Sequence, residues 1–425
     1  MAEYVGVFFT QSDWVAAFLN IDSTSLTTKR TNLVPLISTR RGSADSFFDR
    51  VKIASQFIPA TQTAGGNAQA VRTEGEISKD VASVFSEAGL KNYFQECVVD
   101  QMDEVGTVCI AHSYGMSPVI RRGLSPLILL PVIEHHRTSP NERSTTIQPF
   151  KTKSIERGCA IEVPFAACLE LLVRKRLQPC EQTERVIILG GSEEGIEATV
   201  VNVSRNLSTV TFSAKKHFSG STEKVAAWLD NLSNPLSDCS IDPLTPQKQR
   251  VFSIEGTNAS PALGESIDLS DIASGAARYA ALCAGEQPGV VLVDAEIQKI
   301  EFASVVPHAI GLCGQTPQGE IIWSPLFEAG ERLNGETRSV SFSGETIPPR
   351  LILAESLQQD RIPGEWMIAP PVDQLRWYAE VPVVVPPNVT AGSVAITIQS
   401  STENWNYGWS DPFISALFVP LAITP

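Results

Sequence analysis

The stretch YVGVFFTQSDWVAAFLNI, at residues 4–21, decides how the chain begins to fold. Two apolar runs flank a short polar turn in this stretch, which is typical of a β-hairpin. The hairpin contains a glycine-bearing segment at residues 6–12, and two further glycine-containing turns follow apolar runs at residues 189–195 (LGGSEEG) and 254–261 (IEGTNASP). The sequence therefore predicts three strand–turn units, spaced widely along the chain.

Apolar periodicity predicts the elements between these turns. Strands are expected at residues 105–111, 185–189, 196–203, 208–214 and 251–254, and helices at residues 67–98, 163–176, 222–232 and 271–284. Residues 123–134 are strongly apolar and fit either a strand or a buried helix. From about residue 287, alternating Val, Ile and Thr with many Pro and Gly residues predict an all-β region to residue 425.

Composition places the chain among globular proteins, because 43% of its 425 residues are hydrophobic and 19% are charged. The net charge of −14 is typical of a protein that does not bind DNA. No apolar run is long enough to predict a membrane span. The N-terminus has no basic region of the kind that begins a signal peptide, so a cytoplasmic protein is expected.

The eight cysteines include no CxxC pair, which predicts buried free thiols in a reducing compartment rather than disulfides. The pair His135 and His136 has no neighbouring cysteine or carboxylate cluster, so no metal site is predicted.

Six segments, in order, resemble the nucleotide-binding domain of DnaK-type heat-shock chaperones, which have the actin-like fold. The matching segments are 6–18 (GVFFTQSDWVAAF, first phosphate loop), 107–114 (TVCIAHSY, resembling V-V-I-T-V-P-A-Y), 161–169 (IEVPFAACL, resembling I-N-E-P-T-A-A-A-L), 188–200 (second phosphate loop, two residues longer), 251–261 (adenosine motif) and 273–281 (ASGAARYAA). Beyond them, residues 304–312 and 319–327 resemble the opening of the β-rich substrate-binding domain.

The resemblance implies an α/β actin-like (ribonuclease H-like) domain with two lobes over residues 1–290, lobe I at about 4–180 and lobe II at about 185–290. A linker at 291–306 and a β-sandwich resembling a substrate-binding domain at 307–425 would follow. The β pattern runs to Pro425, so no helical lid is expected. Only residues 201–250 separate the second phosphate loop from the adenosine motif, which predicts that one subdomain of lobe II is missing.

The chain departs from the family at the chemistry of ATP hydrolysis. Phe8, Val163 and Ile188 stand where the family has three carboxylates. An apolar side chain cannot order the hydrated Mg²⁺ that such a site needs. Nine further positions make up the degenerate nucleotide site: Thr10, Ser12, Gly190, Gly191, Ser192, Glu193, Glu255, Gly256 and Ala259. Among them, Thr10 replaces a glycine and Glu193 would repel a triphosphate. A pseudo-ATPase without a cofactor is therefore expected, with ATP binding without hydrolysis left open.

Two positions that carry nucleotide state to the substrate domain in the family are also replaced. His112 occupies the position of a proline in the family, and Ser304 occupies the position of the linker aspartate. We therefore expect no nucleotide signal and one fixed arrangement of the two halves. The linker residues 297–306, IQKIEFASVV, carry Lys299 and Glu301.

Two surfaces are candidates for partner binding. The segment 137–176 holds eight basic and four acidic residues in an acidic protein, so it could contact a ribosome or an acidic partner, although a solvated loop explains it as well. Its candidate contacts are Arg137, Arg143, Lys151 and Lys153. Near the C-terminus, Trp405, Tyr407 and Trp409 are candidate anchors, with packing as the alternative.

The first functional hypothesis is a non-catalytic chaperone-like scaffold or co-chaperone that stably binds a partner protein. The layout resembles the atypical chaperone of the ribosome-associated complex, which implies a J-domain partner at the ribosome. The alternatives are an ATP-dependent chaperone or actin-like kinase with an unusual site, and a structural or assembly subunit.

Overall fold

The structure is a computed structural model. It describes residues 2–10, 13–21, 36–43, 107–115, 157–179, 183–192, 195–233, 248–255, 263–315, 321–332, 334–343, 350–356, 367–368, 375–382, 391–399 and 413–420. The expected helix at 67–98 and the apolar segment 123–134 lie outside these residues.

The first sheet begins with the hairpin expected from the opening sequence. Strand β1 (Ala2–Phe9) pairs antiparallel with β2 (Asp13–Ile21), and β2 pairs antiparallel with β3 (Leu36–Ser43). Strand β4 (Thr107–His112) then pairs parallel with β1, and β5 (Arg157–Glu162) pairs parallel with β4. The order across the sheet is β3-β2-β1-β4-β5.

The second sheet repeats this order. Strands β6 (Glu184–Ser192), β7 (Gly195–Asn206) and β8 (Thr209–Gly220) form an antiparallel meander. Strand β9 (Lys248–Ile254) pairs parallel with β6, and β10 (Glu265–Ile267) pairs parallel with β9.

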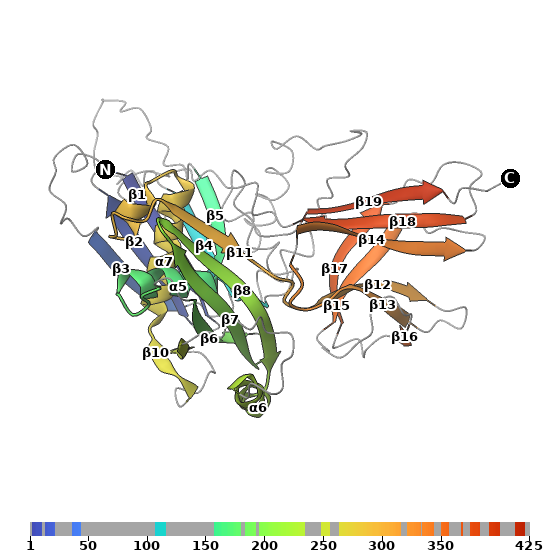
Figure 1. The fold of residues 1–425 in the computed structure, drawn as a ribbon, viewed down its shortest axis with the longest axis horizontal. Coiled ribbons are helices and arrows are strands. Elements are labelled where there is room, and N and C mark those ends of the chain that lie inside the picture. Colours follow the sequence, from blue (N-terminus) through green and yellow to red (C-terminus); the bar gives the residue numbers. More distant parts are fainter. Residues whose placement is uncertain are drawn as a thin grey trace, which may run out of the picture.

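The same strand order thus occurs twice in succession, first in the strands drawn blue to turquoise and then in those drawn green and yellow (Figure 1). A three-stranded meander followed by two parallel strands is a specific arrangement, because each parallel strand requires a crossover connection. The duplicated order fits the actin-like fold that the sequence resemblance implies.

Two helices pack within the core that the sheets share. Helix α5 (Val163–Val173) starts directly after β5, with Pro164 in its first turn, and nine of its residues are buried. Helix α7 (Leu269–Cys283) is capped by the side chain of Asp268, which accepts a hydrogen bond from the Ser270 N–H at 2.7 Å. It packs on the first sheet and on α5.

Small residues in α7 allow close contacts between backbones. A Cβ atom on Gly6 of β1 would overlap with the backbone of α7 at Ala273 and Ala277. A Cβ atom on Gly275 of α7 would overlap with the Ala166 carbonyl of α5. The first glycine of the predicted phosphate loop therefore makes room for a helix.

Helix α6 (Thr222–Ser233) lies on the other face of the second sheet, where Val225 is buried together with Ile187, Leu189 and Ala198. Among the described residues, α6 is the one element between β8 and β9. The missing subdomain stays a prediction, because residues 234–247 lie outside the described residues.

The region predicted to be a linker contains regular structure. Helix α8 (Pro288–Val291) is followed by strand β11 (Lys299–Ala303), which pairs parallel with β8 at the edge of the second sheet. Phe302 of β11 stacks on Phe212 of β8, with ring centroids 5.4 Å apart. Five residues of the predicted linker, Lys299–Ala303, therefore belong to the second sheet.

The elements described beyond β11 are strands in two sheets. The five-stranded sheet has the order β16-β13-β12-β15-β17, and the three-stranded sheet has the order β14-β18-β19. The bounds are β12 (Ala309–Gln315), β13 (Ile321–Phe327), β14 (Asn334–Ser343), β15 (Arg350–Ser356), β16 (Met367–Ile368), β17 (Leu375–Pro382), β18 (Ala391–Gln399) and β19 (Phe413–Pro420). The likeness of this β region to a substrate-binding domain stays a prediction.

Three of the cysteines, Cys109, Cys159 and Cys168, are buried free thiols, as the sequence predicts. Cys109 and Cys159 face each other on β4 and β5, and burial raises the pKa of both. Burial also raises the pKa of Cys168 on α5. A raised pKa keeps a thiol protonated and unreactive at neutral pH. Within the described part of the chain, no three His, Cys, Asp or Glu side chains gather in a group that could hold a metal ion, and no helix is long and apolar enough to cross a membrane.

Candidate functional site

The three positions that lack the family's carboxylates lie in one apolar core. Phe8, the last residue but one of β1, is 7% exposed, while Val163 at the start of α5 and Ile188 on β6 are each 2% exposed. All three belong to the same cluster of buried residues, which joins both sheets with α5 and α7. The side chains therefore support packing at the places where the resemblance implies metal and phosphate chemistry.

This packing predicts a large cost for restoring the first carboxylate. Replacing Phe8 by aspartate would bury a charge without a partner and remove an aromatic ring, so we expect a loss of about 3 kcal/mol or more in the free energy of unfolding. Urea denaturation measures the loss, and Phe8→Leu is the matched control, expected to cost about 1.5 kcal/mol or less. A neutral Phe8→Asp variant would show that Phe8 faces solvent.

The first predicted phosphate loop is a tight hairpin turn. Thr10 donates its backbone N–H to the Asp13 carbonyl at 2.7 Å, and the Asp13 N–H donates to Thr10 Oγ1 at 2.9 Å. The side chain that replaces the family's glycine thus closes the turn. Ser12 lies outside the described residues.

The second predicted phosphate loop is mostly strand. Gly190, Gly191 and Ser192 continue β6 and pair with β7, so the strand runs three residues beyond its predicted end. Ser192 pairs with Gly195. Glu193 lies outside the described residues.

The predicted adenosine motif is only partly described. Glu255 follows β9 in an exposed turn, where its N–H donates to the Ile267 carbonyl at 2.8 Å and its carboxylate accepts from Ser266 Oγ. Gly256 and Ala259 lie outside the described residues.

Direct hydrogen bonds join the two lobes beside Gly190. The buried Glu197 carboxylate of β7 accepts the N–H of Tyr114 at 3.2 Å and the N–H of Gly115 at 3.1 Å, both just beyond β4. A carboxylate that accepts two backbone N–H groups forms charge-assisted hydrogen bonds, which are stronger than neutral ones. Glu197 therefore fastens the end of a lobe I strand to lobe II.

The linker is held at the same place. The Tyr114 hydroxyl donates to the Val305 carbonyl at 2.8 Å and accepts the Val305 N–H at 2.7 Å, so one side chain satisfies both polar groups of a linker residue. Ser304 Oγ donates to Glu162 Oε1, at the end of β5, at 3.2 Å. Ser304, which stands for the relay aspartate, thus still contacts lobe I.

On its other side, the linker contacts the C-terminal half. The Val306 N–H donates to the Glu331 carbonyl at 2.9 Å, and the Gly330 N–H donates to the Val306 carbonyl at 2.8 Å. Arg332 Nη2 donates to Ser213 Oγ of β8 at 3.2 Å. The linker therefore lies between lobe I and a turn of the C-terminal half that also contacts lobe II.

Two buried histidines complete this junction. The rings of His217, on β8, and His308, just before β12, are 5.4 Å apart and meet edge to face. His217 Nδ1 lies 3.0 Å from Thr199 Oγ1. Both imidazoles approach Gly115 so closely that a Cβ atom there would lie 3.1 Å from His308 Nε2 and closer to His217. His112, the other replaced relay position, is buried on β4.

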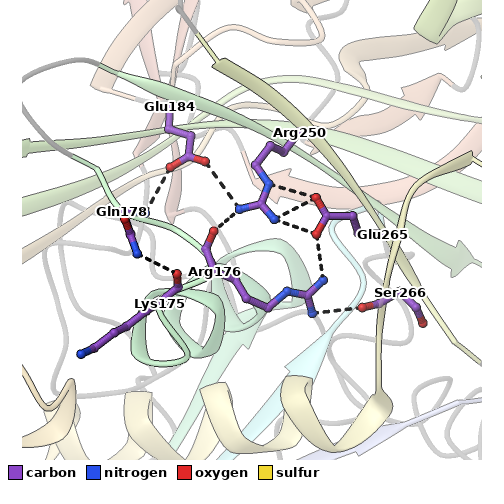
Figure 2. A network of polar contacts seen from close by, with 7 residues as sticks. All are labelled: Lys175, Arg176, Gln178, Glu184, Arg250, Glu265 and Ser266. Carbon is purple, nitrogen blue, oxygen red and sulfur yellow. Dashed lines mark hydrogen bonds and ion pairs between the residues drawn. The ribbon is translucent and has the colours of Figure 1, made fainter.

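A second polar network ties the lobes where the chain passes from α5 to β6, as Figure 2 shows. Arg250 of β9 forms a bidentate pair with Glu265 of β10, with its shortest contact at 2.7 Å, and donates to the Arg176 carbonyl. Arg176 also pairs with Glu265, at 3.2 Å. Hydrogen bonding from Arg250 lowers the pKa of Glu265. The remaining contacts join Arg176 with Ser266, Arg250 with Glu184, and Gln178 with Glu184 and Lys175.

This network accounts for part of the basic stretch. Arg176 and Arg250 both lie over the Phe252 ring, at 5.0 and 4.7 Å from its centroid. Arg174 pairs with Glu170 and Asp271. The charges of Arg174 and Arg176 are therefore engaged within the fold.

The predicted partner contacts lie outside the described residues: Arg137, Arg143, Lys151, Lys153, Trp405, Tyr407 and Trp409, together with the pair His135 and His136. Sequence reasoning missed the roles of Tyr114, Glu162 and Glu197. Tyr114 ends the segment TVCIAHSY, and that match is the signal that could have identified it.

Comparisons with known proteins give little beyond this geometry. No family model and no curated protein matches the chain. Among solved structures, an inorganic polyphosphate/ATP-glucomannokinase from Arthrobacter sp. strain KM is similar at 14% identity and a TM-score of 0.25, covering 66% of this chain and 99% of its own. A Ppx/GppA phosphatase from Aquifex aeolicus is similar at 12% identity and a TM-score of 0.26, covering 60% of this chain and 68% of its own. Likenesses with such low TM-scores do not identify the fold. The repeated strand order of the two sheets supports it instead.

Proposed function

We propose that the protein is a non-catalytic, chaperone-like scaffold that holds a partner protein in a fixed arrangement. The observation that carries the proposal is the burial of Phe8, Val163 and Ile188 in one apolar core. Phosphoryl transfer relies on positioned charges and metal ions, and these three side chains can supply neither.

The fixed arrangement is supported by the contacts around Tyr114. A switch needs two states with different affinities for a ligand, and hydrolysis normally supplies the energy to alternate between them. Here Tyr114, Glu162 and Glu197 already connect lobe I with the linker and lobe II. In the proposal, the C-terminal half presents a partner-binding surface, and a J-domain protein at the ribosome is the partner that the resemblance favours.

Nucleotide binding tests the proposal. We expect no ATP hydrolysis and no change in melting temperature with millimolar Mg-ATP or Mg-ADP, since a ligand at 100 times its dissociation constant would stabilise by about 2.7 kcal/mol. An ATP-hydrolysing actin-like protein is the positive control. An upward shift without hydrolysis would make the protein a nucleotide-binding scaffold, and hydrolysis would favour an ATP-driven chaperone or kinase instead.

The partner gives the second readout. We expect one protein to remain bound through purification from native lysate, in the same amount with ATP, ADP or no nucleotide. Many clients that ATP releases would contradict the scaffold proposal.

A further inference from the structure

One turn of the second sheet has a non-glycine residue with a positive φ, and the same residue exposes a large apolar side chain. The hairpin between β7 and β8 has a two-residue loop, because Asn206 pairs with Thr209. Its first position is Leu207, with φ at 53°. Glycine is favoured where such a loop begins with a positive φ, because a Cβ atom there is strained. The Leu207 side chain is also 91% exposed.

A second turn has the same two features. The Val293 N–H donates to the Val290 carbonyl and the Asp294 N–H to the Gly289 carbonyl, a pattern that places Val293 just beyond the C-cap of α8. Glycine is preferred there, and Gly285 occupies that position after α7. Val293 is β-branched, has φ at 57° and is 42% exposed.

Ion pairs and hydrogen bonds hold the two turns together. Arg205, just before the hairpin loop, pairs with Asp294 at 2.9 Å and with Glu296 at 2.8 Å. The N–H groups of Gln298 and Lys299 donate to the Ser208 carbonyl at 2.8 and 3.2 Å. Each strained residue is thus one position away from a group that binds the other turn. We call Leu207, Val293, Arg205, Asp294 and Glu296 the braced corner.

Folding does not explain these two side chains. Leu207 is 91% exposed and gains little from burial, Val293 is 42% exposed, and a positive φ makes each less stable than glycine or asparagine would be. Strained, locally unfavourable residues concentrate at functional sites. We propose that the braced corner is a docking surface for a partner protein that presents a large apolar side chain flanked by lysine or arginine.

The charges of the corner select the basic flanks. The side chains of Glu296 and Asp294 are 84% and 35% exposed while that of Arg205 is 20% exposed, so the carboxylates are the more exposed members of this ion-paired group. Arg205 is shared by two carboxylates, and the nearby Lys299 pairs with Glu301 at 2.7 Å. The chain as a whole carries a net charge of −14, which disfavours a second copy as the occupant.

The inference stands on the strain and exposure of Leu207 and Val293 and not on the absence of ATPase activity. It goes beyond the proposed function, which names no surface for the partner in the second sheet. Its test leaves out nucleotide, so its failure and the failure of the scaffold proposal are distinguishable.

The test uses the full chain with Leu207→Asn, Val293→Gly and the double variant. Lys175→Gly is the matched control, because Lys175 has φ at 56° just beyond the C-cap of α5 and lies outside the corner. The probe is a set of synthetic 15-residue peptides with a central Leu, Ile or Phe between two lysines or arginines on each side. Matched peptides carry glutamate flanks or a central serine.

We expect the wild-type chain to bind the basic, apolar peptides and the double variant to bind them at least tenfold more weakly. Each substitution, the control included, should raise the melting temperature by about 1–3 °C through relief of strain. Lys175→Gly should leave peptide binding unchanged. The combination of higher stability and lost binding separates a docking surface from a packing role.

Four results would overturn the inference. The wild-type chain might bind none of the peptides, or bind serine-centred or glutamate-flanked peptides equally well. The double variant could bind as tightly as the wild-type chain, or it could melt at a lower temperature. A wild-type dimer that the double variant converts to a monomer in sedimentation would make the corner an interface between copies.

Discussion

Replacing Gly275 by alanine is expected to destabilise the protein by about 3 kcal/mol or more, enough to deplete the folded state of a marginally stable chain. The new Cβ atom would overlap with the Ala166 carbonyl, so the backbones of α5 and α7 would have to separate. A flexible side chain could move aside, but here the obstacle is backbone in a buried helix. The free energy of unfolding in urea, followed by circular dichroism, measures the loss.

The matched control is Gly190→Ala in the predicted second phosphate loop. A Cβ atom on Gly190 would lie 3.5 Å from Ile254 Cδ1, an ordinary contact, so we expect this variant to be as stable as the wild-type chain. If Gly275→Ala unfolded at the wild-type urea concentration, the close packing of α5 on α7 would be wrong.

Replacing Arg278 by methionine is expected to cost about 3–5 kcal/mol, the usual effect of breaking a buried ion pair. Arg278 is buried on α7, where its Nε donates to Glu170 Oε2 of α5 at 2.7 Å. Its Nη1 donates to the Val291 carbonyl at 2.6 Å. The substitution leaves the buried Glu170 carboxylate with Arg174 as its remaining ion-pair partner in the described part of the chain. Calorimetry or urea denaturation measures the cost.

A double variant distinguishes a lost pair from lost packing. Adding Glu170→Leu to Arg278→Met removes the stranded charge, so the two changes together should cost less than the sum of the single changes. Additive costs would show that the two side chains do not interact across α5 and α7.

Local pattern predicted much of the N-terminal fold. The polar turn at residues 10–14 predicted the β1–β2 hairpin, and helical spacing predicted α5 and α7 to within a few residues. The sequence predicted these elements because the formation of each depends mainly on residues that are close together in the sequence. The place of β11 in the second sheet was missed because the resemblance put residues 291–306 in a linker, although Ile300 and Phe302 alternate with Lys299 and Glu301 and pack on the core.

The junction could not be predicted, because its contacts join residues far apart in the sequence. Tyr114 binds Val305 across 191 positions, and Glu197 binds the backbone of Gly115 across 82 positions. The basic residues at 174–176 were visible as charge, but their partners Glu265 and Asp271 lie on other elements. Sequence shows that a charge is present, and only the fold shows whether it is already paired.

We expect the linker to stay fixed between lobe I and the C-terminal half whatever nucleotide is present. Amide hydrogen exchange over residues 299–306 measures this most directly, because β11 and Val305 have defined hydrogen-bond acceptors. Tyr114→Phe is the control that shows the measurement responds, since it removes both hydrogen bonds to Val305 and should speed exchange there. The account predicts slow exchange at the same rate with no nucleotide, Mg-ADP and Mg-ATP in the wild-type chain. Protection that appears or disappears when Mg-ATP is added would contradict it.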